Sequence, residues 1–351
     1  MSKMLEETRQ QPVTLSRTLE QGLRTTRSLQ KHFQGKRPRM ILLAARGTSD
    51  NAAHFGRYLI EMTTGIPVSL AAPSIVTLYG RGLELRDMLV VGISQSGEST
   101  DINAVLADAR ERGAVAVGIT NEPRSAMAKI AHEVLLVRAG TETSVAATKT
   151  YTGQLLALYL LALALGGHVQ EDRLRRIPDW TAAVMKLESR VAETVERYRF
   201  MNGTVTVGRG LNYATALEFG LKLMETCYVL AQGFSAADLM HGPIAMVERD
   251  FPVFVFAPTG ATWPSIAGVL EHLDELKADT LVITDRRNSK ARSRSRLIEL
   301  PAQPGPDNGI SDLYTPIPYI IPAQLFAAHL AEVKGLNPDR PRRLSKITRT
   351  M

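Results

Sequence analysis

Short apolar runs, each ending in a polar turn, recur along the first half of the chain. The runs are residues 40–45, 88–93, 114–119 and 134–137. Segments with apolar residues three and four positions apart lie between them and predict amphipathic helices. Strands that alternate with helices are typical of a mostly parallel sheet covered on both faces, so the pattern predicts an α/β fold.

The same order of strands and turns recurs in the second half. Gly97 follows Gly47 by 50 residues, and Gly260 follows Gly210 by the same 50 residues. We therefore predict an internal duplication of one doubly wound unit. The predicted parts are an N-terminal helical segment (1–35), a first subdomain (36–170), a helical connector (171–200), a second subdomain (201–335) and a C-terminal tail (336–351).

Composition and charge say more about the location and partners of the protein than about its chemistry. The longest apolar stretch, Leu155–Leu165, is shorter than the ~18–20 residues of a membrane span, so we predict a buried helix there. The N-terminus has no apolar signal core, and Cys227 is the only cysteine. Both features favour the cytoplasm. The net charge of +7 fits an anionic metabolite or nucleic acid, but basic runs such as 286–296 and 340–349 are typical of solvated faces. We expect no nucleic acid and no membrane as partners.

Small hydroxyl side chains gather at two predicted strand ends of the first half. They are Thr48, Ser49, Ser94, Ser96 and Ser99, with Gln95 among them. Ligands of open parallel sheets bind beyond the carboxyl ends of the strands, where hydroxyls and backbone N–H groups suit an anion. The alternative is that these serines only cap helices. Two such loops favour a phosphate site, whereas the loop after Gly260 has no serine cluster.

Candidate acid–base groups lie in the second half and the tail. Glu218, Lys222 and Glu225 share one face of a predicted helix, beside an apolar face with Leu217, Leu221 and Met224. This spacing is most typical of a surface salt bridge, and the alternative is a carboxylate base tuned by the ammonium. His241 precedes Gly-Pro and Lys346 lies near the end of the chain. Taken alone, each is more typical of a structural or solvated residue.

Six motifs in this order resemble the sugar isomerase (SIS) domain family, in particular the isomerase half of the glucosamine-6-phosphate synthases. They are residues 47–49, 93–99, 141–149, 216–225, 241–243 and 340–346. The resemblance implies two tandem doubly wound parallel-sheet SIS subdomains of flavodoxin-like form. It also implies a homodimer with the site near the subunit interface, a phosphosugar substrate, no cofactor and no metal.

The resemblance further implies a role for each candidate residue. Ser49, Ser94, Gln95, Ser96 and Ser99 would hold the phosphate. Thr48, Val145 and Ala147 would lie near the sugar. Glu225 would move a proton between C1 and C2, with Lys222 and Glu218 as its neighbours. His241 would open the ring from across the dimer interface, and Lys346 would form an imine with a ketose.

The synthases also carry a glutaminase domain that begins with cysteine, whereas here about 35 residues precede the first predicted strand. We therefore predict a glucosamine-6-phosphate deaminase that yields fructose-6-phosphate and ammonia. Within the same class, the alternatives are a fructosamine-phosphate deglycase and an isomerase or aminotransferase subunit that uses external ammonia. A non-catalytic phosphosugar sensor is the alternative from another class.

Overall fold

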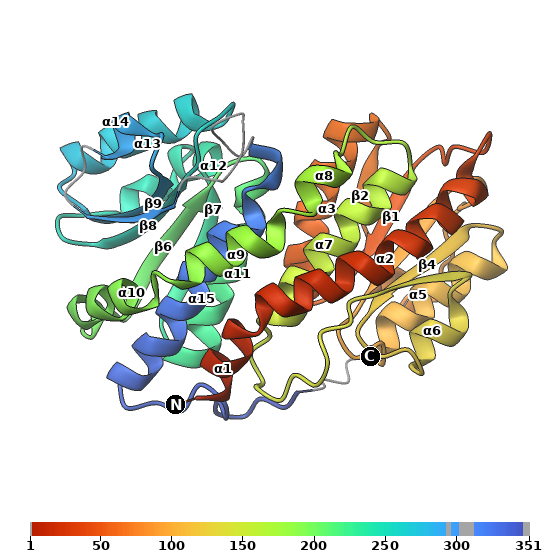
Figure 1. Ribbon diagram of the computed structural model, residues 1–351, viewed down its shortest axis with the longest axis horizontal. Coiled ribbons are helices and arrows are strands. Elements are labelled where there is room, and N and C mark those ends of the chain that lie inside the picture. The colour runs from red at the N-terminus through yellow and green to blue at the C-terminus, as the bar shows by residue number, and fades with distance from the viewer. Residues whose placement is uncertain (1, 293–295, 302–311, 347–351) are drawn as a thin grey trace. The chain divides into compact units, whose positions relative to one another are not determined.

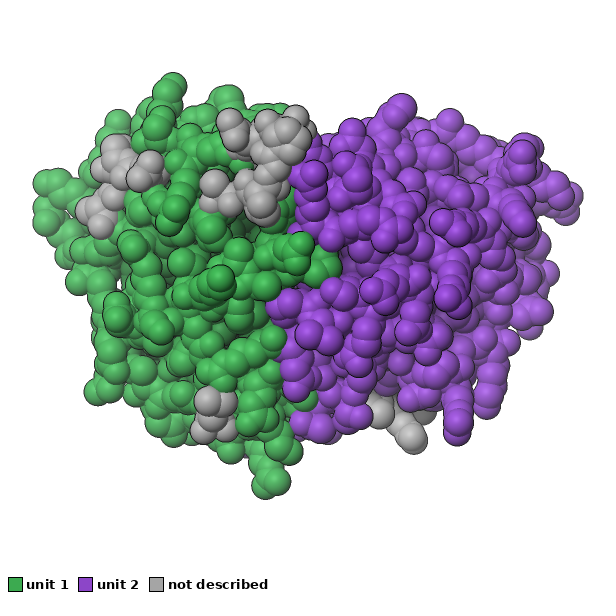
Figure 2. All heavy atoms as spheres, in the orientation of Figure 1, with its two compact units in different colours: residues 1–9, 144–146, 177–342 green, residues 10–143, 147–176, 343–351 purple. Residues whose placement is uncertain are grey.

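A computed structural model of the chain describes residues 2–292, 296–301 and 312–346. The chain forms two compact units, coloured separately in Figure 2. Unit 1 contains residues 1–9, 144–146 and 177–342, and unit 2 contains residues 10–143, 147–176 and 343–351. Each unit holds one five-stranded parallel sheet with flanking helices, which confirms the predicted α/β class with two tandem sheets. The basic runs 286–296 and 340–349 lie partly outside the described residues.

The sheet of unit 2 has the strand order β2-β1-β3-β4-β5, and every strand pair is parallel. Its strands are β1 (Ile41–Ala44), β2 (Val68–Leu70), β3 (Leu89–Ile93), β4 (Val115–Thr120) and β5 (Glu133–Leu136). Four of the five coincide with predicted runs, and β2 was not predicted. The first strand lies next to the third, so the carboxyl ends of β1 and β3 are neighbours at one edge of the sheet.

Helices cover both faces of this sheet (Figure 1). The helices of unit 2 are α2 (Gln11–Phe33), α3 (Thr48–Thr64), α4 (Ser74–Thr77), α5 (Thr100–Glu111), α6 (Ala126–Ile130), α7 (Lys149–Ala164) and α8 (Glu171–Leu174). Leu42 and Val90 pack against α5 and α6, whereas Leu43 faces α3 and α7. Helix α2 lies alongside α7. Because α7 buries residues on every side, the apolar stretch Leu155–Leu165 is a core helix, as predicted.

Unit 1 repeats the architecture with the order β7-β6-β8-β9-β10. Its strands are β6 (Gly203–Gly208), β7 (Leu230–Ser235), β8 (Pro252–Ala257), β9 (Asp279–Asp285) and β10 (Leu297–Leu300). The helix after the first strand has 17 residues in each unit, α3 in unit 2 and α11 (Leu211–Cys227) in unit 1. The glycine before each helix has nearly the same backbone torsions, φ 54° and ψ −129° at Gly47, φ 57° and ψ −128° at Gly210. The two units therefore share one backbone plan.

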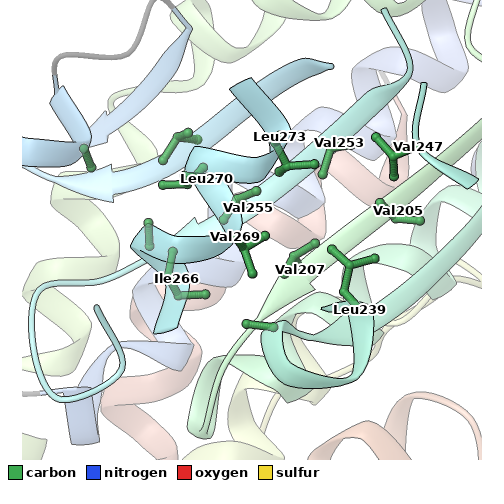
Figure 3. Close-up of a cluster of buried hydrophobic side chains, with 14 residues drawn as sticks. Val205, Val207, Leu239, Val247, Val253, Val255, Ile266, Val269, Leu270 and Leu273 are labelled. Carbon is green, nitrogen blue, oxygen red and sulfur yellow. The ribbon is translucent and has the colours of Figure 1, made fainter. Parts of the chain in front are cut away.

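Strand β8 divides the core of unit 1 into two layers, since alternate residues of a strand point to opposite faces. Val253 and Val255 meet Leu270 of α13 (Trp263–Glu275) in the cluster drawn in Figure 3. On the other face, Phe254 contacts Phe219 of α11 and Phe326 of α15 (Pro316–Val333), with ring centroids 5.1 and 5.0 Å apart. The remaining helices are α1 (Lys3–Arg9), α9 (Ile177–Met185), α10 (Glu188–Val195), α12 (Ala236–Met240) and α14 (Ser289–Arg292).

Candidate active site

The loop after β3 in unit 2 is shaped by its own hydroxyls. Ser94 Oγ accepts a hydrogen bond from the Gly97 backbone N–H (3.1 Å), and Ser96 Oγ accepts one from the Glu98 N–H (3.2 Å). Gly97 has φ +65°, and a Cβ there would collide with the Ser125 side chain. A hydroxyl that accepts a bond still has its own hydrogen to donate, so both serines keep the polarity that an anion needs.

The turn after β1 places Thr48 and Ser49 at the start of α3. Ser49 is buried, and its Oγ accepts a hydrogen bond from Gln154 Nε2 of α7 at 2.9 Å. Sequence reasoning missed Gln154, because nothing in the pattern of α7 marks one buried amide as the partner of a serine 105 residues away. The bond fixes the orientation of Ser49 and again leaves the hydroxyl hydrogen available.

Neither strand-end loop uses its hydroxyls as helix caps. The described N-terminus of α3 is capped by Gly47 and that of α5 by Ser99, and neither helix has a side-chain cap hydrogen bond. The capping alternative is therefore not realised at these two helices. That the hydroxyls of these two loops hold a phosphate stays a prediction.

An open cavity of about 610 Å³ in unit 2 brings several of these residues together. Of the predicted site residues, Gln95, Ser96 and Lys346 line it. Glu142 lies in the same wall, beside the tail lysine. The remaining predicted residues of unit 2, Thr48, Ser49, Ser94, Ser99 and Ala147, are not part of its lining. The tail lysine and the loop after β3 thus share one cavity.

Glu142 was named only as part of a motif, and the structure gives it a specific environment. Its side chain is fully buried and accepts hydrogen bonds from the Thr148 N–H (2.9 Å), the Thr150 hydroxyl (2.6 Å) and Lys346 Nζ (2.9 Å). Burial alone would raise the pKa of this carboxyl, but the Lys346 charge and the threonine hydrogen bonds outweigh it, and the pKa is lowered. Glu142 is therefore an ionised group inside the protein.

The acid–base candidates on α11 in unit 1 form a compact set. Lys222 Nζ lies 2.5 Å from Glu225 Oε2 and 3.4 Å from Glu218 Oε1. The side chains of Lys222 and Glu218 are fully buried, whereas that of Glu225 is 23% exposed. Burial lowers the pKa of Lys222, but Glu218 and Glu225 raise it by more, so the ammonium stays charged. This arrangement is not the surface salt bridge that the spacing alone favours.

The expected apolar face of α11 also differs from the prediction. Met224 is 43% exposed, and Leu217 and Leu221 are only partly buried, while the charged Lys222 is enclosed. Helix α11 buries a polar stripe because the two carboxylates neutralise the ammonium within it. Glu225 keeps one edge open to solvent and so can exchange a proton with a ligand.

His241 and the sugar loop complete the predicted set. His241 is exposed at the end of α12 in unit 1, and within the described part of the chain its ring makes no hydrogen bond. Val145 belongs to unit 1 and Ala147 to unit 2.

Among the described residues, no group of three or more His, Cys, Asp or Glu side chains could hold a metal ion. None of the described helices is long and apolar enough to cross a membrane.

Two parallel α/β units with one backbone plan define the class of protein. One unit has hydroxyl-rich strand ends, and the other has two glutamates beside a buried lysine. The SIS domain model matches residues 36–164 and 202–333, and the chain belongs to this family, as the motifs predicted.

Several proteins of known sequence or structure are similar to this chain. The chain is 38% identical over 314 residues to the glutamine–fructose-6-phosphate aminotransferase [isomerizing] of Pyrococcus horikoshii, covering 87% of this chain and 51% of that protein. It thus spans about half the length of the curated relatives it matches. The C-terminal domain of glucosamine-fructose-6-phosphate aminotransferase from Francisella tularensis is 28% identical, with a TM-score of 0.88 over 97% of this chain and 98% of that one. Glucosamine-6-phosphate deaminase from Thermotoga maritima has a TM-score of 0.77 over 99% of this chain and 100% of that one. At 22% identity it shares the fold alone.

Proposed function

We propose that the chain converts fructose-6-phosphate and ammonia into glucosamine-6-phosphate and water, by amination at C2 and proton transfer between C1 and C2. The observation that carries this proposal is Glu225, whose side chain is 23% exposed and is anchored by the buried ammonium of Lys222. The relatives named as aminotransferases, at 38% and 28% identity, support the synthetic direction.

The groups present suit each step of this reaction. The phosphate binds at Ser49, Ser94, Gln95, Ser96 and Ser99. Binding energy at this end of the substrate orients C1 and C2 without touching them. The Lys346 ammonium first gives up a proton to solvent, and the free amine then condenses with the C2 ketone and releases water. Ammonia then displaces the lysine from the imine. Glu225 removes a proton from C1 and returns one to C2, which leaves an aldehyde at C1 and an amine at C2. His241 then moves the proton that closes the ring.

The deaminase predicted from the sequence uses the same chemistry in reverse. The relatives favour synthesis over deamination, because the deaminase of known structure is similar in fold alone. A deglycase would need the same proton transfer on a substituted amine. A sensor would have no use for a buried, charge-compensated Lys222 beside a solvent-facing Glu225.

Product analysis in both directions tests the proposal. The protein is incubated with fructose-6-phosphate and an ammonium salt in D₂O, and in parallel with glucosamine-6-phosphate or a fructosamine phosphate. We expect glucosamine-6-phosphate with deuterium at C2 in the first reaction. Ammonia release from glucosamine-6-phosphate without any synthesis would favour the deaminase, and turnover of the fructosamine phosphate alone would favour the deglycase. Binding without turnover or deuterium exchange in any reaction would overturn the assignment as an enzyme.

We also propose that the active species is a cytoplasmic homodimer in which each subunit lends His241 to its partner. The exposed position of His241 supports this, because its ring has no hydrogen-bonding role within the described part of its own chain. Mixing His241→Asn chains with Glu225→Gln chains tests it. If the two residues act on the same substrate from different subunits, half of the random dimers are mixed and each has one intact site, so about a quarter of wild-type activity returns. No recovery after subunit exchange would place His241 and Glu225 in one chain.

A further inference from the structure

The tail of the chain reaches back to a residue 204 positions earlier. Lys346 Nζ donates a hydrogen bond to Glu142 Oε2 at 2.9 Å, within unit 2. The Glu142 side chain has no exposure, whereas that of Lys346 is 24% exposed. A hydrogen bond between two charged groups is stronger than a neutral one, and its buried half protects it from screening. The hydrogen bond between Lys346 and Glu142 is therefore stronger than one between two fully exposed side chains.

Glu142 is held in place by groups other than the lysine. Its Oε1 accepts the backbone N–H groups of Thr148 (2.9 Å) and Thr150 (3.1 Å), and its Oε2 accepts the Thr150 hydroxyl (2.6 Å). These donors lie at the start of α7, which is buried throughout this turn. The carboxylate is thus fixed to a core helix.

The loop that carries Glu142 is also tied down. Asn121, at the end of β4, accepts the Ala139 N–H (2.8 Å) and donates to the Gly140 carbonyl (2.8 Å). Lys149 Nζ donates to the Thr141 carbonyl at 2.6 Å. The segment just before Glu142 is therefore anchored both to the sheet, through Asn121, and to α7, through Lys149. These contacts keep the carboxylate in the wall of the cavity lined by Gln95 and Ser96.

The part of the tail before Lys346 is held separately within unit 1. Asp339 accepts the Lys3 and Met4 N–H groups at the start of α1 (2.8 and 2.9 Å). The Arg342 N–H donates to the Tyr228 hydroxyl at 2.8 Å, and the Arg342 guanidinium lies 4.8 Å from the centre of that ring. Asp339 and Arg342 therefore hold the tail within unit 1, and Lys346 is held within unit 2 by Glu142.

We propose that Glu142 is a positioning residue that holds the Lys346 amine in the cavity beside Gln95 and Ser96, ready for a ketose bound by the phosphate loop. Glu142 acts through the lysine and has no contact with the sugar in this proposal. The inference rests on the proposed function, since it assigns the lysine a ketose as its partner. The competing view is that Glu142 only stabilises the start of α7.

The test compares Glu142→Gln with Glu171→Gln, the same substitution at an exposed glutamate of unit 2 whose cation partner is Arg175. Borohydride reduction in the presence of fructose-6-phosphate converts the imine on Lys346 to a stable secondary amine, which mass spectrometry counts. Losing one charge-assisted hydrogen bond should lower trapping about ten-fold or more. The KM for fructose-6-phosphate should change less than about three-fold, because the phosphate loops are untouched. Glu171→Gln should behave as wild type.

A second readout follows the tail itself. Trypsin cleavage after Arg343 should speed up in Glu142→Gln and in Lys346→Met, with the folded protein confirmed by an unchanged melting temperature. If Glu142→Gln proves unstable, Lys346→Met alone carries this readout, since it leaves the bonds from Glu142 to α7 in place. Unchanged cleavage in Lys346→Met, or full trapping in Glu142→Gln, would overturn the inference while leaving the proposed function intact. Faster cleavage in both variants with no trapping in the wild type would show that Glu142 holds the tail, but it would reject the imine step of the proposed function and with it the role assigned to Glu142 here.

Discussion

Replacing Lys222 by methionine tests the buried charges of α11 most directly. Methionine has a similar length and no charge, so the change removes the ammonium and keeps most of the packing. It leaves the fully buried Glu218 without its cation 3.4 Å away and Glu225 without its anchor at 2.5 Å. Removing one partner of a buried ion pair typically costs about 3–5 kcal/mol, because the remaining charge is still desolvated. We expect a loss of this size in the free energy of unfolding.

The pH dependence has a definite sign. The pKa of Lys222 is raised in the folded protein, so its stabilising contribution is complete below the unfolded value of about 10.4 and is lost only at higher pH. The wild-type contribution is therefore constant from pH 6 to 9. In Lys222→Met, by contrast, the stranded carboxylates can be relieved by protonation. The deficit should thus be largest near neutral pH and smaller at about pH 5.

Tryptophan fluorescence is a suitable probe, because the two tryptophans of the chain, Trp180 and Trp263, both belong to unit 1. Urea unfolding with a slope of about 2 kcal/mol per molar should shift its midpoint down by about 1.5–2.5 M. Arg199→Met, which breaks an ion pair whose side chains are 63% and 60% exposed, is the control and should cost less than about 0.5 kcal/mol. A shift for Lys222→Met no larger than the control would refute the view that two carboxylates stabilise this buried ammonium.

Three further variants test the site and the core. Glu225→Gln should lower kcat about 10²–10⁴-fold while titration calorimetry still detects fructose-6-phosphate binding; loss of binding would make Glu225 a ligand group instead. Gly97→Ala places a Cβ at φ +65° against the Ser125 side chain, so it should weaken phosphate binding measured by the same titration; unchanged affinity would mean that this loop does not hold the phosphate. Phe254→Ala removes a ring that packs on Phe219, Phe326 and Tyr198, so it should cost about 3–5 kcal/mol in urea unfolding, and a cost below about 1 kcal/mol would contradict the packing described for β8.

The sequence predicted the central strands and one edge strand, β5, and missed the three other edge strands. Strands β2, β7 and β10 each lie at the edge of a sheet. Strand β2 has only three residues, and β7 alternates exposed positions such as Leu230 with small inward residues such as Ala231. An edge strand pairs on one side only and needs no continuous apolar run, so periodicity gives little signal there.

The candidate site also contains residues that the sequence could predict and residues that it could not. The serine loops were predictable because their residues are neighbours in the chain and follow strand ends. Glu142 and Lys346 are 204 residues apart, so no local pattern could join them. The burial of Lys222 was missed for another reason. Spacing placed it on one face with Glu218 and Glu225 but could not tell which face the protein would enclose.

The two units share a backbone plan but differ in the groups at the start of the helix that follows β3 in unit 2 and β8 in unit 1. In unit 1 the loop after β8 corresponds to the proposed phosphate loop, but Asp312 already occupies it: the Thr262 N–H and hydroxyl donate to its carboxylate at 3.0 and 3.1 Å. A Cβ on Gly260 would collide with that carboxylate, so the approach of Asp312 requires the glycine. A helix N-terminus favours an acidic group, and here the chain supplies one itself. Burial raises the pKa of the Asp312 carboxyl, although its hydrogen bonds with Thr262 act against this. A free phosphate would have to displace this partly buried carboxylate. Unit 1 is therefore closed to the ligand class proposed for unit 2, although the two units share the torsions of Gly47 and Gly210.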